Sequence, residues 1–185
     1  MPTAPHVELH NVANGVQITW GNVSHAYEYV VYRSGGGGSF EPVATLRKQN
    51  AWKYVDEKTK NMEGERFTYK IGARAKQNVY EESESEEVSI IRLAPVTALK
   101  LKNGEGLSID CSWEEHPNAD GYEVRVAAEG QKRFIQIKRT TLNEITLIDI
   151  YNTKTYRVQV RPYKEGDGKY YFGNWCNAKK IRARR

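Results

Sequence analysis

The sequence has 185 residues, of which 39% are hydrophobic and 11% aromatic, and its formal net charge is +5. This composition excludes a disordered chain, because enough apolar surface is available to bury a core. No run of about 18 apolar residues occurs, and no basic segment is followed by an apolar stretch, so we expect neither a membrane span nor a signal peptide.

The first predicted strand with a clear pattern covers residues 16–20. Val16, Ile18 and Trp20 alternate there with Gln17 and Thr19. A period of two is typical of a half-buried antiparallel strand, and Tyr29 and Val31 begin a second such run. Turn signals such as Asn14-Gly15 and the four glycines at 35–38 separate these runs, and no stretch of ten or more residues has a helical period.

A short connection near Pro95 divides the chain. Proline cannot donate to a strand ladder and favours an extended neighbour, so Pro95 is expected to begin a new first strand. We therefore predict two domains, residues 1–93 and 94–185.

The second half repeats the first. At an offset of 93 residues the apolar positions of residues 16–31 fall on those of residues 109–124, namely Ile109, Cys111, Trp113, Ala119, Tyr122 and Val124. Later the offset shrinks to 87, which aligns Tyr69, Ile71 and Ala73 with Tyr156, Val158 and Val160. Seven or so short strands in each copy of about 92 residues predict an all-β fold of two tandem immunoglobulin-like, seven-stranded Greek-key β-sandwiches.

Both copies resemble the fibronectin type III family over nearly the whole chain. The resemblance rests on a Trp in the second strand (Trp20, Trp113), a Tyr nine residues later (Tyr29, Tyr122) and a Tyr entering the sixth strand (Tyr69, Tyr156). In the family this last Tyr forms the tyrosine corner, with an apolar residue six positions before it. Ile150 has that spacing in the second copy, whereas in the first copy Met62 lies seven positions ahead.

The loop sequences are similar to those of repeats in Gram-positive bacterial surface or secreted proteins. This resemblance implies an extracellular or cell-surface segment of a larger protein with flanking domains, acting as a spacer or adhesion segment with protein or glycan contacts. Two alternatives remain open. One is a receptor-like or phage-structural binding protein with a ligand at the inter-domain elbow or the second-domain hairpin loop, and the other is an accessory region of a larger extracellular enzyme.

No catalytic motif accompanies this pattern. Nucleophile-elbow, phosphate-loop and Cys/His arrangements are missing from the sequence, and its four histidines lack ligand spacing, so we expect no enzyme activity, no cofactor and no metal. Cys111 replaces Ile18 on an inward face, and we expect Cys111 and Cys176 to be free thiols.

The charge and the aromatic residues both favour the second half as a binding region. Residues 1–93 hold 11 Lys and Arg against 12 Asp and Glu, whereas residues 94–185 hold 17 against 11. The acidic run at residues 81–87 is expected to be a solvated hairpin loop, with a calcium site as a less favoured alternative. The basic tail, residues 179–185, lacks adjacent stacking platforms, so we expect no specific nucleic-acid binding.

The best binding candidate is the hairpin between the sixth and seventh strands of the second copy. Aromatic and lysine side chains there could stack on sugar rings or anchor a protein partner. The alternative is that Tyr163, Tyr171 and Trp175 pack across their own hairpin. The candidate ligand-binding residues are Tyr163, Lys169, Tyr170, Tyr171, Phe172 and Trp175.

Overall fold

The structure is a computed structural model that describes residues 4–47, 51–76, 82–134 and 136–184. The chain divides into two compact units, Met1–Arg92 and Leu93–Arg185, which we call module 1 and module 2. This division lies one residue before the boundary expected from Pro95. No helix in the described ranges has the length and apolarity needed to cross a bilayer.

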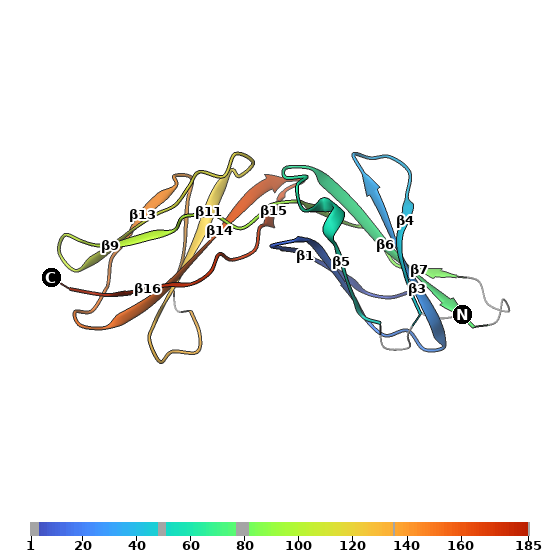
Figure 1. Ribbon diagram of the computed structural model, residues 1–185, viewed down its shortest axis with the longest axis horizontal. Helices are drawn as coiled ribbons and strands as arrows, with labels where there is room; N and C mark the ends of the chain where they lie inside the picture. Colours follow the sequence, from blue (N-terminus) through green and yellow to red (C-terminus); the bar gives the residue numbers. More distant parts are fainter. Residues whose placement is uncertain (1–3, 48–50, 77–81, 135, 185) are drawn as a thin grey trace. The chain divides into compact units, whose positions relative to one another are not determined.

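Module 1 contains two layers of antiparallel strands. One sheet has the order β1-β2-β5, and the other has the order β4-β3-β6-β7, with β8 also paired to β6. Figure 1 shows β1 and β5 in one layer and β3, β4 and β6 in the other. The described strands are β1 (Val7–Val12), β2 (Gly15–Trp20), β3 (Ala26–Gly35), β4 (Glu41–Leu46), β5 (Lys53–Asp56), β6 (Arg66–Ala75), β7 (Ser83–Glu84) and β8 (Val88–Ile91), with a 3-10 turn at Glu57–Thr59.

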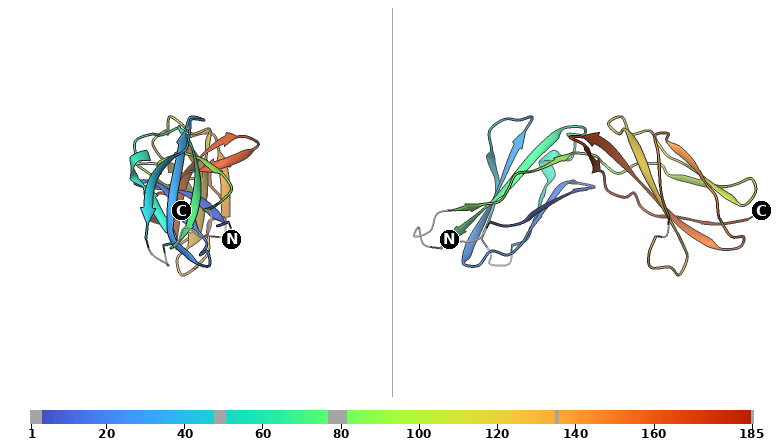
Figure 2. Two further views of the ribbon diagram at one scale, coloured as in Figure 1. Left: turned by 90° about the vertical axis from the view of Figure 1, so that its right-hand side faces the viewer. Right: turned by 180° about the vertical axis from the view of Figure 1, so that it is seen from behind.

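Module 2 repeats this arrangement. Its sheets have the orders β13-β10-β9 and β12-β11-β14-β15, with β16 also paired to β14. The rear view in Figure 2 shows the strands of each module from the opposite side. The described strands are β9 (Lys100–Gly104), β10 (Ser108–Ser112), β11 (Gly121–Ala128), β12 (Gln136–Thr140), β13 (Glu144–Leu147), β14 (Thr155–Gly166), β15 (Lys169–Phe172) and β16 (Lys179–Arg182). The predicted fold class, two tandem immunoglobulin-like β-sandwiches of the fibronectin type III kind, is confirmed.

The repeated aromatic residues form the same contact in both modules. The ring centroids of Trp20 and Tyr29 lie 5.7 Å apart, and those of Trp113 and Tyr122 lie 5.2 Å apart. In each module the Tyr hydroxyl accepts a backbone N–H from the residue six positions before it. These buried pairs explain why the spacing of Trp and Tyr is kept in both copies.

The predicted alignment of the sixth strands is wrong by two residues. Val31 pairs with Ile71 in module 1, whereas the equivalent Val124 pairs with Val160 in module 2. An offset of 89 residues, not 87, therefore relates the two strands, and the equivalent of Tyr156 is Phe67. In module 1 the position of Tyr156 is occupied by Phe67, and Tyr69 follows two residues later, so the alignment matched the two tyrosines.

Only module 2 has the expected tyrosine corner among the described residues. The backbone N–H of Tyr151 donates to the Tyr156 hydroxyl at 2.9 Å. In module 1 the Tyr69 hydroxyl instead donates to the carboxylate of Asp56 at 3.0 Å, and Arg33 Nη1 donates to the same oxygen at 2.8 Å. Burial, and then the Asp56 charge, raise the pKa of Tyr69. These three side chains form the buried polar triad of module 1.

In module 2 apolar residues take the places of this triad. The strand registers make Val126 the equivalent of Arg33, Leu147 the equivalent of Asp56, and Val158 the equivalent of Tyr69. All three are buried. The same interior site is thus filled by an ion pair with a hydroxyl in one copy and by hydrocarbon in the other.

The last strand of each sandwich is interrupted at the same place. In module 1 the Ser85 N–H donates to the carbonyl of Ile71, and the Ile71 N–H donates to the Ser85 hydroxyl. In module 2 the Cys176 N–H donates to the carbonyl of Val160, and the Val160 N–H donates to the Cys176 sulfur. Cys111 and Cys176 are both free and buried.

Candidate functional site

The predicted hairpin of module 2 is formed by β14 and β15. Asp167 and Gly168 both have positive φ, 52° and 70°, as a two-residue type I′ turn requires. This turn fixes the register, in which Tyr163 pairs with Phe172 and Glu165 pairs with Tyr170. Directly paired residues point to the same face of a sheet.

The hairpin separates the six predicted residues into two groups. Tyr163, Tyr170 and Phe172 lie on the outer face of the sheet, and their ring centroids are 5.1 to 6.3 Å apart. Tyr171 faces the other way and is 4% exposed, and Lys169 lies over its ring at 4.8 Å. Tyr163 is also buried, at 6% exposure, and its hydroxyl covers Gly121 so closely that a Cβ there would collide with it.

Trp175, from the interrupted last strand, joins the outer group through arginine side chains. The guanidinium groups of Arg125 and Arg161 lie over its ring, at 4.0 and 4.4 Å from the centroid. Both guanidinium groups are thus within cation–π distance of the same indole ring. Trp175 therefore holds two arginines from different strands, β11 and β14.

This alternation of cation and ring continues in both directions across the sheet. Arg161 also lies 3.8 Å from the Phe172 centroid, and Arg139 lies 4.3 Å from the Tyr170 centroid. On the other side Phe134 is contacted by Arg125 at 4.1 Å and by Arg157 at 5.3 Å. We call this row the arginine–aromatic ladder, and its members in spatial order are Arg157, Phe134, Arg125, Trp175, Arg161, Phe172, Arg139 and Tyr170.

A single buried carboxylate anchors one end of the ladder. Glu123, whose side chain is 5% exposed, accepts two hydrogen bonds from Arg139 on one oxygen and two from Arg161 on the other. Such charge-assisted pairs are short and directional, so they fix both guanidinium planes. The hydrogen bonds that Arg139 donates to Glu123 raise the pKa of that arginine.

The other end of the ladder has no such acid. Arg125 donates from Nε and Nη2 to the Gln159 side-chain oxygen, at 3.1 and 2.7 Å. Burial lowers the pKa of Arg125, and the charges of Arg161 and Arg157 lower it further. The four ladder arginines against Glu123 leave a surplus of positive charge on this face.

The residues predicted from the sequence include Tyr170, Phe172 and Trp175 of the ladder but neither Phe134 nor the four arginines. The arginines come from β11, β12 and β14, which are far apart in the sequence. A signal was present, because Arg157, Arg161 and Tyr163 lie an even number of residues apart on one strand and must share a face.

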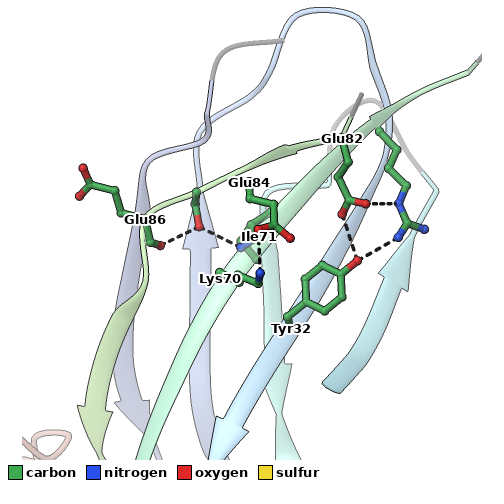
Figure 3. A network of polar contacts seen from close by, with 8 residues as sticks. Tyr32, Lys70, Ile71, Glu82, Glu84 and Glu86 are labelled. Carbon is green, nitrogen blue, oxygen red and sulfur yellow. Dashed lines mark hydrogen bonds and ion pairs between the residues drawn. The ribbon is translucent and has the colours of Figure 1, made fainter. Parts of the chain in front are cut away.

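On the equivalent face of module 1, basic side chains are paired with acids. Figure 3 shows the Glu82 carboxylate beside the Tyr32 hydroxyl and shows Lys70 beside Glu84. Arg74 donates to Glu82 at 2.8 Å, and Lys70 donates to Glu84 at 2.7 Å.

The acidic run therefore differs from the expected solvated loop. Its described part contains strand β7, and Glu82 and Glu84 are ion-paired to the neighbouring strand β6; Glu81 lies outside the described residues. No group of three His, Cys, Asp or Glu side chains suited to a metal ion occurs in the ranges that the structure describes.

The cysteines are not placed as nucleophiles. Burial raises the pKa of Cys111 to about 12 and also raises the pKa of Cys176. The thiolate is the reactive form, so both thiols are unreactive at neutral pH while the protein is folded.

Comparisons with known proteins show no family for this chain. Neither a family model nor a curated protein matches the chain. Solved structures do match. Among the 445 matching chains is the "Crystal structure of chicken CNTN1 FN1-FN3 domains", with 18% sequence identity, a TM-score of 0.46, and coverage of 99% of this chain and 67% of that one. A fold shared so widely does not determine a function, which must be argued from the site.

Proposed function

We propose that this chain is a non-catalytic tandem β-sandwich segment of a secreted or cell-surface protein, in which module 2 recognises a partner and module 1 acts as a spacer. The observation that supports this proposal is the arginine–aromatic ladder. Its side chains are held in place by Glu123, Gln159 and one another, so little side-chain entropy is lost when a partner binds.

The ladder has the composition of a recognition surface. Arg and aromatic residues are enriched at the centres of interfaces, because they provide large contact areas and directional hydrogen bonds. On module 2 these residue types form one continuous row, and the outer face of module 1 has no comparable row among its described residues.

Partner binding can be tested on a panel of extracellular proteins and glycans. The informative variant is Trp175→Ala, because it removes the ring between Arg125 and Arg161. Its matched control is Trp52→Ala, which removes a tryptophan of module 1 that is 56% exposed and lies outside the ladder. We expect saturable binding that Trp175→Ala weakens by about tenfold or more and that Trp52→Ala leaves unchanged.

Two results would contradict the proposal. If no member of the panel binds saturably while the protein is folded, both modules are better explained as spacers. If the two tryptophan variants weaken binding equally, the site lies elsewhere. If the chain is instead a receptor-like or phage-structural binding protein, its ligand site is expected at this hairpin or at the inter-domain elbow. An accessory region of a larger enzyme is expected to show the same binding behaviour as a spacer.

A further inference from the structure

At the end of the ladder formed by Arg125 and Arg157, the positive charges outnumber the neighbouring negative charges. In the described part of module 2 neither guanidinium forms an ion pair, and both lie against the same ring, Phe134. The acid whose charge interacts with Arg157 is Glu129, which is already paired with Lys180 at 3.1 Å. Arg125, Arg157 and Lys180 against Glu129 leave two net positive charges at this end.

The hydrogen-bond donors at this end are partly unused. Arg125 uses Nε and Nη2 for Gln159, and no described residue accepts a hydrogen bond from its Nη1. Arg157 donates from Nη2 to the Gln131 carbonyl at 2.6 Å. The N–H groups of Arg125 Nη1 are therefore available to a further acceptor.

We propose that this end of the ladder, with Arg125 and Arg157 as the contact residues, binds sulfate groups of a sulfated polysaccharide. The inference rests on the proposed function, since it names the ligand class for the same site. Guanidinium groups match oxyanions through paired N–H donors, and a fixed planar group loses less freedom per bond than a lysine does.

The geometry favours recognition of charge over stacking on sugar rings. Each of these rings is already in contact with two arginines, Trp175 with Arg125 and Arg161, and Phe134 with Arg125 and Arg157, which leaves less ring surface for a sugar. The cations form a row, in which Arg125 and Arg161 are no farther apart than their two distances from Trp175 combined. A linear polymer with closely repeated anionic groups can contact several of them at once.

The inference can be tested by measuring the affinity of the whole chain for heparin by calorimetry at several salt concentrations. The variants are Arg125→Gln with Arg157→Gln, and Arg125→Lys, which keeps the charge but loses the planar fork. The control is Lys100→Gln, because Lys100 is exposed on β9 of the opposite sheet and its loss removes one positive charge, as the loss of each single arginine does, so that losses of affinity are compared per charge removed. Thermal unfolding of each variant verifies that module 2 stays folded.

We expect salt-sensitive heparin binding that falls by roughly tenfold for each of the two arginines removed, falls partly in Arg125→Lys, and is nearly unchanged in Lys100→Gln. Equal losses in the Lys100 and arginine variants would overturn the inference, since they would indicate general charge attraction.

Three comparison polymers separate this inference from the proposed function. Polyglutamate represents an acidic protein segment, polyphosphate a phosphate polymer, and hyaluronan a glycan with carboxylates alone. If one of them binds more tightly than heparin and depends on Arg125, the ligand class is wrong and the recognition role stands. If none of the polymers binds, the sulfated polysaccharide is excluded, and the protein and glycan panel with Trp175→Ala decides the proposed function independently.

Discussion

The buried polar triad of module 1 leads to a quantitative prediction about Tyr69→Phe. This substitution removes the hydroxyl that donates to Asp56 and leaves the packing of the ring intact. A hydrogen bond to a charged group contributes about 1.5–3 kcal/mol, so we expect the free energy of unfolding to fall by about 2 kcal/mol. For a domain of this size, that corresponds to a decrease of about 8–16 °C in the Tm of module 1.

Tyr156→Phe is the matched control in module 2. The hydroxyl lost there accepts a neutral backbone N–H from Tyr151, and such a bond contributes about 0.5–1.5 kcal/mol. The decrease in stability should therefore be about half as large, and it should appear in module 2 alone. Hydrogen exchange during urea unfolding assigns each loss to its module.

The decisive variant replaces all three triad residues with their equivalents from module 2, as Arg33→Val, Asp56→Leu and Tyr69→Val. Removing one partner of a buried ion pair leaves an uncompensated charge, whereas replacing the whole group by hydrocarbon is often neutral or stabilising. We expect the free energy of unfolding of the triple variant to lie within about 1 kcal/mol of that of the original chain. A triple variant that loses the sum of its single-variant losses would refute the reasoning.

Three further predictions follow from the described contacts. Glu123→Gln should lower the Tm of module 2, because it removes the ion pairs with Arg139 and Arg161. A double-mutant cycle with Arg161→Gln measures the interaction energy between Glu123 and Arg161. The folded state favours the protonated Cys111 thiol, so the contribution of this thiol to the free energy of unfolding is complete below pH 9 and is lost as the pH rises toward 12. Urea titrations should show that the free energy of unfolding of the original chain falls by up to about 4 kcal/mol relative to that of Cys111→Ala over this range. Parallel pH dependences of the two proteins would contradict this prediction. Millimolar calcium should leave the Tm of module 1 unchanged, because Glu82 and Glu84 are engaged by basic side chains, and a clear rise would show a site there.

The fold could be predicted from the sequence because its interior is periodic. Alternating apolar residues determine which side of each strand is buried, and the Trp and Tyr pairs showed that the pattern occurs twice. The register of β6 could not be predicted in this way. A shift of two residues keeps the inward face inward, so Tyr69 and Phe67 both satisfy the pattern, and only the pairing with β3 distinguishes them.

The candidate site was only half predictable for a different physical reason. A hairpin brings neighbours in sequence together, so Tyr163, Tyr170 and Phe172 were found from their local spacing. Arg139 reaches these rings from β12 and Arg125 reaches Trp175 from β11, and a contact across strands has no local signature. The inclusion of Lys169 and Tyr171 with Tyr170 overlooked the alternation of side chains along β15, which places them on the other face.

The two copies differ most clearly in the chemistry of their outer faces. Val30 and Gly72 pair on the outer face of module 1, and the pair at the same positions in module 2 is Glu123 and Arg161. A buried glutamate is costly without partners, so its presence in module 2 is understandable only together with the arginines that it holds. A sandwich does not need this pair to fold, since module 1 lacks it. The ladder is therefore not a requirement of the fold, and the proposed recognition role accounts for the excess of positive charge that it leaves on the surface.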